Sequence, residues 1–177
     1  MSVENQSSYK KILVIATRCI IIHNDKILLV ADQDRGNDEF WYLPGGWIDG
    51  LEYVYDAAER EVYEETGLKV VAKKIVKISQ SLYDDRGRHN NLVNKFQLYI
   101  YCSLLDDQDI SEKTLDKWVD SDNALVSKRR FFSFEQISNG EIKVPENFKQ
   151  IDFKNIKNQE DIFLGLLDPK NLKNQDF

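Results

Sequence analysis

The segment from Gly46 to Leu68 constrains this chain more than any other. It reads Gly-Trp-Ile-Asp-Gly-Leu-Glu-Tyr-Val-Tyr-Asp-Ala-Ala-Glu-Arg-Glu-Val-Tyr-Glu-Glu-Thr-Gly-Leu. Its second half predicts a helix that carries Glu61, Glu64 and Glu65 on one face, because residues three and four apart on a helix are neighbours. Carboxylates at this spacing repel one another and destabilise an isolated helix by about a few tenths of a kcal/mol per pair.

The position of these acids within the helix is also unfavourable. Glu64 and Glu65 fall in the last turn, just before the expected C-terminal cap Gly67, where negative charge opposes the helix dipole. A helix that needed only to fold would not gather acids there. A bound divalent cation would reverse the sign of both penalties, and ligands that offer only oxygen atoms suit Mg²⁺ or Mn²⁺.

The spacing of this segment resembles the pattern of the Nudix hydrolases, G-x5-E-x7-R-E-U-x-E-E-x-G-U, where U is a bulky apolar residue. The residues at the fixed positions are Gly46, Glu52, Arg60, Glu61, Val62, Glu64, Glu65, Gly67 and Leu68. A surface helix with solvated glutamates does not account for agreement at every fixed position. The resemblance proper covers this motif and its lead-in from Trp41, and a looser likeness extends over roughly residues 10 to 140.

The resemblance implies that the chain hydrolyses a phosphoanhydride with the help of a metal ion, which neutralises phosphate oxygens and activates water. It gives Glu61 and Glu65 as metal ligands, and Glu64 either as a third ligand or as the holder of a metal-bound water. In relatives the carbonyl of the residue before the first motif glycine, here Gly45, also binds metal. The general base is left open between Glu61 and Glu64. The implied cofactor is Mg²⁺ or Mn²⁺.

Two further features follow from the resemblance. Arg60 is expected to pair with Glu52 and to fix the loop against the helix. Leu51 stands where many relatives have glycine, and Gly50 precedes it, so the conformation of this loop is expected to differ from theirs. An acid from a later loop often completes the site in this family. The candidates by position are Asp106, Asp107, Asp109, Glu112, Asp120 and Asp122, with Glu135 ranked below them. Each alone is better explained as a solvated acid.

Substrate-binding residues are expected outside the motif. Arg35 and Arg88 are predicted to contact phosphates from loops, and Trp47 and Tyr83 to stack on a base. The plainer alternatives are solvated charges for the arginines and a packing role for Tyr83. The position of Tyr83 roughly fits that of a tyrosine in a dinucleoside-polyphosphate subgroup, while the proline that marks an ADP-ribose subgroup is absent.

The resemblance implies that the substrate is a small nucleotide, a nucleoside diphosphate linked to another moiety. The alternatives within enzymes are a (deoxy)nucleoside triphosphate pyrophosphohydrolase and a dinucleoside polyphosphate hydrolase. The alternative from another class is a non-catalytic ligand-binding module of the same fold. Such modules usually lose metal-binding acids, and this chain keeps all of them, which favours an enzyme.

Composition sets wider limits. The chain has 177 residues, which suits one well-packed domain, and its 42% hydrophobic and 11% aromatic content is that of a soluble globular protein. The formal net charge of −6 argues against a nucleic-acid partner bound by bulk electrostatics. With only His23 and His89 available, a zinc site built on histidine is implausible.

No membrane or export segment is expected. The longest apolar run, residues 12 to 22, is interrupted by Thr17 and Arg18 and is too short to span a bilayer. The first residues lack the apolar core of a signal peptide. Cys19 and Cys102 stand singly in apolar runs, so both are predicted to be buried free thiols. A cytoplasmic location is the simplest expectation.

Periodicity predicts a mixture of strands and helices. The expected strands cover residues 12–22, 27–31, 40–43, 69–82, 91–105 and 124–132, and the expected helices cover residues 52–66 and 134–137. The first two strands are expected to form a hairpin, because residues 23–26, His-Asn-Asp-Lys, suit a turn. Residues 106–123 are expected to form an acidic segment anchored by Trp118. These elements suit an α+β or layered α/β domain, and the resemblance implies a Nudix-type mixed β-sheet sandwiched between α-helices.

The expected domain organisation is a single domain over residues 1–177, in which residues 145–177 form a C-terminal extension. This extension is rich in Lys, Asn and Gln, and its one apolar cluster is expected at residues 162–167, Ile-Phe-Leu-Gly-Leu-Leu. This cluster is predicted to form a helix that packs on the domain or on a partner, such as the second copy in a homodimer.

Overall fold

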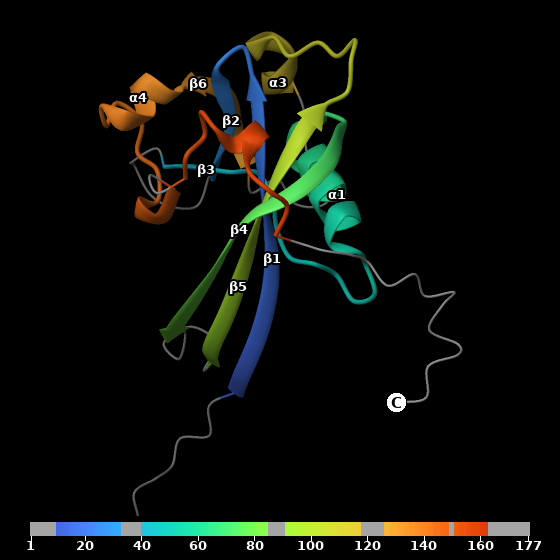
Figure 1. The fold of residues 1–177 in the computed structure, drawn as a ribbon, viewed down its shortest axis with the longest axis vertical. Coiled ribbons are helices and arrows are strands. Elements are labelled where there is room, and N and C mark those ends of the chain that lie inside the picture. The colour runs from blue at the N-terminus through green and yellow to red at the C-terminus, as the bar shows by residue number, and fades with distance from the viewer. Residues whose placement is uncertain (1–9, 33–39, 85–90, 118–125, 149–150, 163–177) are drawn as a thin grey trace, which may run out of the picture.

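The fold comes from a computed structural model, which describes residues 10–32, 40–84, 91–117, 126–148 and 151–162 (Figure 1). The strands are β1 (Lys10–His23), β2 (Lys26–Asp32), β3 (Trp41–Tyr42), β4 (Val70–Asp84), β5 (Asn91–Leu104) and β6 (Val126–Ser133). The α-helices are α1 (Val54–Thr66), α3 (Glu112–Lys117) and α4 (Phe134–Ser138), and Glu146–Phe148 and Ile156–Asn158 form single 3₁₀ turns.

The strands form one mixed sheet in the order β3-β2-β1-β5-β4, and β6 pairs with β2. The long pairing of β1 with β5 is parallel, from Lys10 opposite Asn91 to Ile21 opposite Cys102, whereas the other pairs are antiparallel. The predicted mixed sheet is thus confirmed. The predicted hairpin between β1 and β2 is also present, with Asn24 at φ 47° and Asp25 at φ 57° in its turn. Positive φ at both central residues is what the tight hairpin turns of type I′ require.

Helix α1 packs on one face of the sheet. Its buried side chains include Ala58 and Val62, which meet Ile75, Ile100 and Cys102 of the sheet in one core cluster. The helix ends where Gly67 adopts φ 73° and its N–H donates to the carbonyl of Tyr63 (2.8 Å), as expected for a left-handed cap. Cys19 and Cys102 are both buried and free, as predicted.

The other face is covered by α4 and by the chain beyond Pro145 (Figure 1). Helix α4 starts with a capping box in which Ser133 and Gln136 each accept a backbone N–H of the other. Beyond Pro145, the side chains of Phe148, Ile151 and Ile156 are buried in the core cluster of this face. The prediction that residues 162–167 hold the only apolar anchor of this extension is therefore wrong. Residues 163–167 lie outside the described residues.

The segment after β5 also differs from the prediction. It contains α3, which the acidic composition did not indicate, and its buried anchor is Leu115, 1% exposed. Trp118, the predicted anchor, lies outside the described residues. Leu115 belongs to the core cluster beneath α1, so α3 extends the layer on that face.

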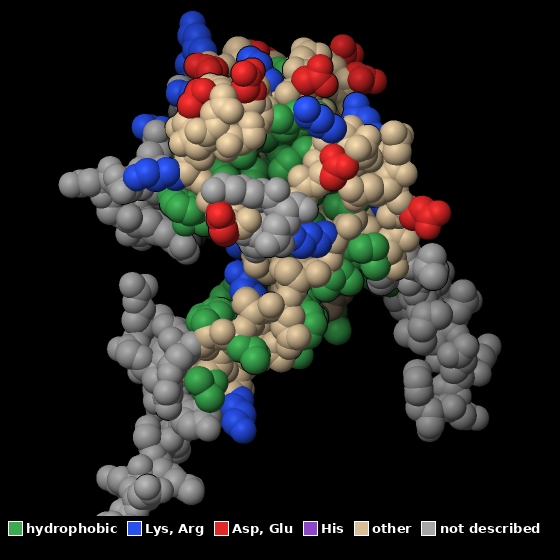
Figure 2. All heavy atoms as spheres, turned by 60° about the vertical axis from the view of Figure 1, so that its left-hand side comes forward, with side chains coloured by type: hydrophobic (Ala, Val, Ile, Leu, Met, Phe, Trp, Pro, Cys, Tyr) green, Lys and Arg blue, Asp and Glu red, His purple; other side chains and the backbone are tan. Residues whose placement is uncertain are grey.

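The ends of β1, β4 and β5 project beyond α1 and α4 as a long three-stranded arm (Figure 1). Large apolar side chains remain exposed on one face of it, namely Leu13, Ile15, Ile78 and Leu82, and Figure 2 shows hydrophobic side chains along the projecting part. Of the helices that the structure describes, none combines the length and the apolar character needed to cross a bilayer.

Candidate active site

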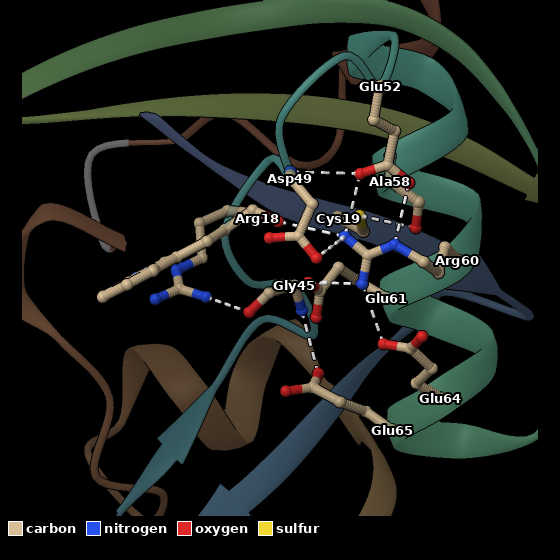
Figure 3. Close-up of polar contacts among 11 residues, drawn as sticks. Arg18, Cys19, Gly45, Asp49, Glu52, Ala58, Arg60, Glu61, Glu64 and Glu65 are labelled. Atoms are coloured by element: carbon tan, nitrogen blue, oxygen red, sulfur yellow. Dashed lines mark hydrogen bonds and ion pairs between the residues drawn. The ribbon is translucent and has the colours of Figure 1, made fainter. Parts of the chain in front are cut away.

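The loop before α1 is fixed to strand β1 by backbone hydrogen bonds. The N–H groups of Thr17 and Cys19 donate to the carbonyls of Gly46 (2.8 Å) and Pro44 (2.7 Å), and Ile48 N–H donates to the carbonyl of Ile15 (3.1 Å). This pairing holds the loop in place between β1 and the acidic face of α1 (Figure 3).

Gly45 and Gly46 allow this close approach in different ways. A Cβ on Gly45, where φ is 136°, would lie 2.5 Å from the backbone oxygen of Thr17. A Cβ on Gly46 would lie 2.4 Å from Oε2 of Glu61. Only glycine satisfies the first position, because both its dihedral angle and the space beside the backbone exclude a side chain. The second glycine leaves room for the carboxylate of Glu61.

Glu65 and Arg18 hold Gly45 from two sides. The N–H of Gly45 donates to Oε2 of Glu65 (2.9 Å), while Nη1 of Arg18 donates to the carbonyl oxygen of Gly45. Arg18 comes from β1 and was not among the predicted site residues. Its signal in the sequence is a cation that interrupts an apolar strand, noted above only as a break in a hydrophobic run.

Arg129 of β6 is a second residue that the sequence did not single out. It is 2% exposed and its Nε donates to the backbone carbonyl of Glu65. Carbonyl groups in the last turn of a helix lack partners within the helix, so this contact satisfies one of them. It ties the end of α1 that carries Glu65 to the sheet.

Arg60 links the loop to the helix. Its Nε and Nη2 donate to the two carboxylate oxygens of Glu52 at 2.8 and 2.9 Å, a bidentate contact, and Nη2 also donates to the carbonyl of Trp47 (3.0 Å). Its Nη1 donates to Glu61 (2.9 Å) and Glu64 (2.8 Å). The Arg60–Glu52 contact that the resemblance implies is present, and the same guanidinium partly neutralises two of the clustered acids.

The pKa values of Glu52 and Glu61, which both accept hydrogen bonds from Arg60, shift in opposite directions. The hydrogen bond from Arg60 lowers the pKa of Glu52, and the carboxylates around it raise the pKa of Arg60, led by the hydrogen bond to Glu52. Burial raises the pKa of Glu61, against the opposing effect of Arg60, and the charge of Glu64 adds to the rise. The side chain of Glu61 is 13% exposed. Glu61 therefore holds a proton more readily than an ordinary glutamate.

The oxygen atoms gathered here suit a hard cation. Glu61 and Glu65 supply carboxylates and Gly45 supplies a carbonyl, and Mg²⁺ and Mn²⁺ prefer such oxygen-only ligands. In the described part of the chain, no three His, Cys, Asp or Glu side chains stand in a ready metal-binding group. The glutamates contact Arg60 and the Gly45 N–H through single carboxylate oxygens.

The predicted substrate-binding residues are only partly placed. Trp47 is 60% exposed at the edge of the loop, next to Arg60. Tyr83 pairs with Val93 near the end of the arm. Val93 in turn pairs with Ile12, which is about 17 Å of strand from Thr17. The structure therefore does not bring Tyr83 to the glutamates. Arg35 and Arg88 lie outside the described residues.

The later acids make contacts elsewhere. Asp109 accepts hydrogen bonds from the N–H of Ser111 in its own loop and from the hydroxyl of Thr114 in α3, and Glu112 lies 3.6 Å from Arg130. Glu135 lies in the first turn of α4. Asp106 and Asp107 are exposed in the turn after β5, and Asp120 and Asp122 are outside the described residues.

A hollow of about 200 Å³ opens beside Arg18. Its lining residues are Arg18, Tyr42, Leu43, Lys95, Gln97, Tyr99, Pro145 and Phe148. These come from β1, β3, β5 and the chain around Pro145, so the hollow lies on the sheet face opposite α1. Two of the lining side chains, Arg18 and Lys95, are cationic, which suits an anionic ligand.

Comparison with known proteins places these features in a family. The NUDIX domain family matches residues 13–156. Human "Nucleoside diphosphate-linked moiety X motif 6" is 36% identical over 81 residues, 45% of this chain and 23% of that protein. "Diphosphoinositol polyphosphate phosphohydrolase 2" of Rattus norvegicus is 32% identical over 111 residues, 63% of this chain and 51% of that protein. The match thus spans about a quarter to a half of the length of these curated relatives.

A solved structure of a NUDIX hydrolase from Nitrosomonas europaea superposes with a TM-score of 0.62 at 16% identity, over 85% of this chain and 94% of that one. At this identity the likeness concerns the fold, and the fold agrees with the mixed sheet and flanking helices described above. Since the family match covers most of the chain, including the glycine loop, α1 and the strands that hold them, the protein belongs to the Nudix hydrolase family.

Proposed function

We propose that this protein is a Mg²⁺- or Mn²⁺-dependent hydrolase that cleaves the pyrophosphate bond of a nucleoside diphosphate linked to another moiety. The observation that carries the proposal is the cluster of Glu61, Glu64 and Glu65 on α1, packed against the Gly45–Gly46 loop and ordered by Arg60. The names of the human and rat relatives support it, since both refer to phosphoanhydride-containing compounds. The proposed substrate is a small nucleotide. The protein is proposed to act in the cytoplasm and to bind no nucleic acid.

In this proposal Glu61, Glu65 and the Gly45 carbonyl hold the cation, and Glu64 is a third ligand or holds a bound water. When bound, the cation neutralises phosphate oxygens and lowers the pKa of water. Arg60 and Glu52 keep the loop and helix in register, so that the ligand atoms stay aligned. The general base is Glu61 or Glu64. The raised pKa of Glu61 favours Glu61, because a base works best when its pKa lies closer to the working pH.

The proposed substrate contacts are Trp47 at the site edge, together with Arg35, Tyr83 and Arg88. Tyr83 lies on the arm, away from the glutamates. In this proposal it would contact a distant part of a long substrate, or a second copy of the chain, and not the cleaved bond. Triphosphate pyrophosphohydrolysis and dinucleoside polyphosphate hydrolysis remain alternative activities of the same site.

The test is phosphate release from a panel of ADP-ribose, NADH, nucleotide sugars, nucleoside triphosphates and diadenosine polyphosphates, with Mg²⁺ and again with excess chelator. We expect turnover of at least one diphosphate-linked compound, and its loss in chelator. Full turnover in chelator would overturn the metal-dependent mechanism.

Glu65→Gln tests the assigned cluster directly. The amide keeps the shape of the side chain and removes its charge, so kcat should fall by at least about a hundredfold. Asp56→Asn is the matched control, because Asp56 is an exposed acid in the first turn of the same helix, and it should keep wild-type kcat. Near-normal turnover in Glu65→Gln would remove Glu65 from the proposed ligands.

A further inference from the structure

Arg18 stands between the acid cluster and the cationic hollow. Its guanidinium donates to the carbonyl oxygen of Gly45, the oxygen proposed above as a cation ligand. The N–H of the same glycine donates to Oε2 of Glu65 (2.9 Å). Figure 3 shows Arg18 reaching Gly45 from the side away from α1. The arginine thus places a positive charge where a metal ion would place its own.

The same side chain also lines the hollow on the far side of the loop. Lys95 and Gln97 lie on β5 at alternate positions, opposite Val14 and Ala16 of β1, and Arg18 lies opposite Tyr99. Since alternate residues of a strand share one face and cross-strand partners do too, Arg18, Lys95 and Gln97 point to the same side of the sheet. All three are half-buried and line the hollow. Two cations and an amide in one partly dry hollow match the oxygens of a phosphate group.

A divalent cation and a guanidinium at one carbonyl oxygen repel each other strongly in a partly buried site. The presence of one therefore weakens the binding of the other. The hollow is the place to which Arg18 can turn without leaving its strand, because its side chain already forms part of the wall.

We propose that Arg18 is a substrate-positioning residue with two alternative partners. Without a metal ion it holds the Gly45 carbonyl; when an ion takes this oxygen, Arg18 turns to a phosphate group of the substrate, which it binds in the hollow together with Lys95. The proposal rests on the proposed function. It makes metal binding the event that releases a phosphate-binding arginine, so that metal and substrate bind cooperatively.

The decisive prediction is a pair of effects with opposite signs. Arg18 competes with the ion but assists the substrate. Arg18→Ala should therefore bind Mn²⁺ about two- to tenfold more tightly in the absence of substrate, while its KM for a hydrolysed substrate should rise about tenfold. A residue that merely supports the loop would weaken both. Arg18→Lys should recover part of the KM, since it restores charge without the planar fork of the guanidinium.

The experiment is Mn²⁺ titration by electron paramagnetic resonance and calorimetry on substrate-free wild type, Arg18→Ala, Arg18→Gln and Lys95→Ala, with steady-state kinetics on each. Lys95→Ala separates the two effects, because it should raise KM and leave Mn²⁺ affinity within about twofold of wild type. Arg18→Gln keeps a neutral donor for the Gly45 carbonyl and serves if Arg18→Ala does not fold. It should bind Mn²⁺ more tightly than wild type as well.

Weaker or unchanged Mn²⁺ binding in both Arg18→Ala and Arg18→Gln would overturn the competition. An unchanged KM in Arg18→Ala and Lys95→Ala would overturn the phosphate contact. If wild type hydrolyses no compound in the panel but the Arg18 variants still bind Mn²⁺ more tightly, the proposed function fails while the competition between Arg18 and the ion stands.

Discussion

Two neighbouring glycines in the loop before α1 meet different obstacles. Gly45 faces backbone, the oxygen of Thr17, and has φ 136°, whereas Gly46 faces the movable carboxylate of Glu61. A backbone obstacle cannot yield without shifting β1, but a side chain can rotate. The two positions therefore separate what the loop needs in order to fold from what it needs in order to keep Glu61 in place.

Alanine at each glycine should show this separation. Gly46→Ala should displace the Glu61 carboxylate and reduce kcat at least about tenfold, with a melting temperature close to wild type. Gly45→Ala should instead lower the free energy of unfolding by about 1–3 kcal/mol or more, because of strain at its φ and the clash with Thr17. The measurements are kcat and thermal melting on both variants. Wild-type activity in Gly46→Ala, or wild-type melting in Gly45→Ala, would contradict the assignment.

At this scale the sequence predicted contacts that follow from helical spacing and missed those that depend on strand register. Glu61, Glu64 and Arg60 lie within one or two turns of α1, so their proximity is a local property. Arg18 and Gly45 are 27 positions apart, and their contact exists only because β1 pairs with the loop in one register. Single-sequence reasoning has no access to this register.

At the scale of elements, the last described residues join α1 to the sheet. Asp161 accepts hydrogen bonds from the hydroxyl of Tyr55 on α1 and from the N–H of Ile75 on β4, both at 3.0 Å. The N–H of Ile162 then donates to the carbonyl of Ile75 (2.9 Å). The C-terminal extension therefore connects the helix that carries the acids to an edge strand.

Because of the contact between Tyr55 and Asp161, the free energy of unfolding should depend on pH. Burial, followed by the hydrogen bond to Asp161, raises the pKa of Tyr55 to about 12. The unfolded phenol titrates near 10, so the folded state binds this proton more tightly. The contribution is complete below about pH 10 and is lost as pH rises from about 10 to 12.

Tyr55→Phe should abolish this part of the alkaline loss and cost about 0.5–1.5 kcal/mol near neutral pH, the worth of one hydrogen bond. The checks are chemical denaturation and phenolate absorbance from about pH 8 to about 12, which covers the range in which this stability is lost. Tyr53→Phe, at the N-cap of α1 and two positions before Tyr55, is the control and should behave like wild type. An identical alkaline loss in Tyr55→Phe would refute the role of this contact.

Two truncations test the extension as a structural element. Deletion after Val144 removes Phe148, Ile151 and Ile156, which are 2%, 9% and 0% exposed. Burying each such side chain contributes about 1.5–3 kcal/mol, so the loss approaches the total stability of a typical domain. Deletion after Ile162 keeps all three residues and the Asp161 contacts.

We expect the shorter protein to be unfolded or to melt far below wild type, and the longer one to melt near it. The measurements are the melting temperature and the light-scattering mass of both truncated proteins. A fully stable protein ending at Val144 would show that the extension is not part of the core. A loss of dimer mass on deletion after Ile162, with the melting temperature unchanged, would place residues 163–177 in a dimer interface.

The sequence predicted some elements of the fold but not the buried residues of the C-terminal extension. Helix α1 and the β1–β2 hairpin were predicted because apolar periodicity and turn residues mark them locally. Phe148, Ile151 and Ile156 are single apolar residues among Lys, Asn and Asp, a pattern without helical or strand period. Their burial depends on a surface made by β1, β2, β3 and β5, which forms only once the sheet is assembled.

At the scale of the whole molecule, the acids make the metal-free protein less stable than it would be with an ion. The chain carries a formal net charge of −6, and three glutamates lie near one another at the end of α1. An ion that binds only the folded state stabilises it by mass action, by about 2.7 kcal/mol at a hundredfold excess over Kd.

Saturating Mg²⁺ or Mn²⁺ should therefore raise the melting temperature by about 5 to 10 °C for a chain of this size. Excess chelator should reverse the rise. Glu65→Gln should show a smaller rise than wild type, and Asp56→Asn the same rise. No shift in wild type, together with no heat of binding in calorimetry, would argue against an ion at this site.

The parallel pairing of β1 with β5 has a consequence for how the molecule is made. Every residue of the glycine loop and of α1 lies in sequence between these two strands, and α1 packs partly on Ile100 and Cys102 of β5. Closing so long a loop is entropically costly and slow. A chain emerging from the ribosome therefore has its complete set of acids well before it has the surface that orients them. The capacity to bind an ion should arise late in synthesis, after β5 has joined β1.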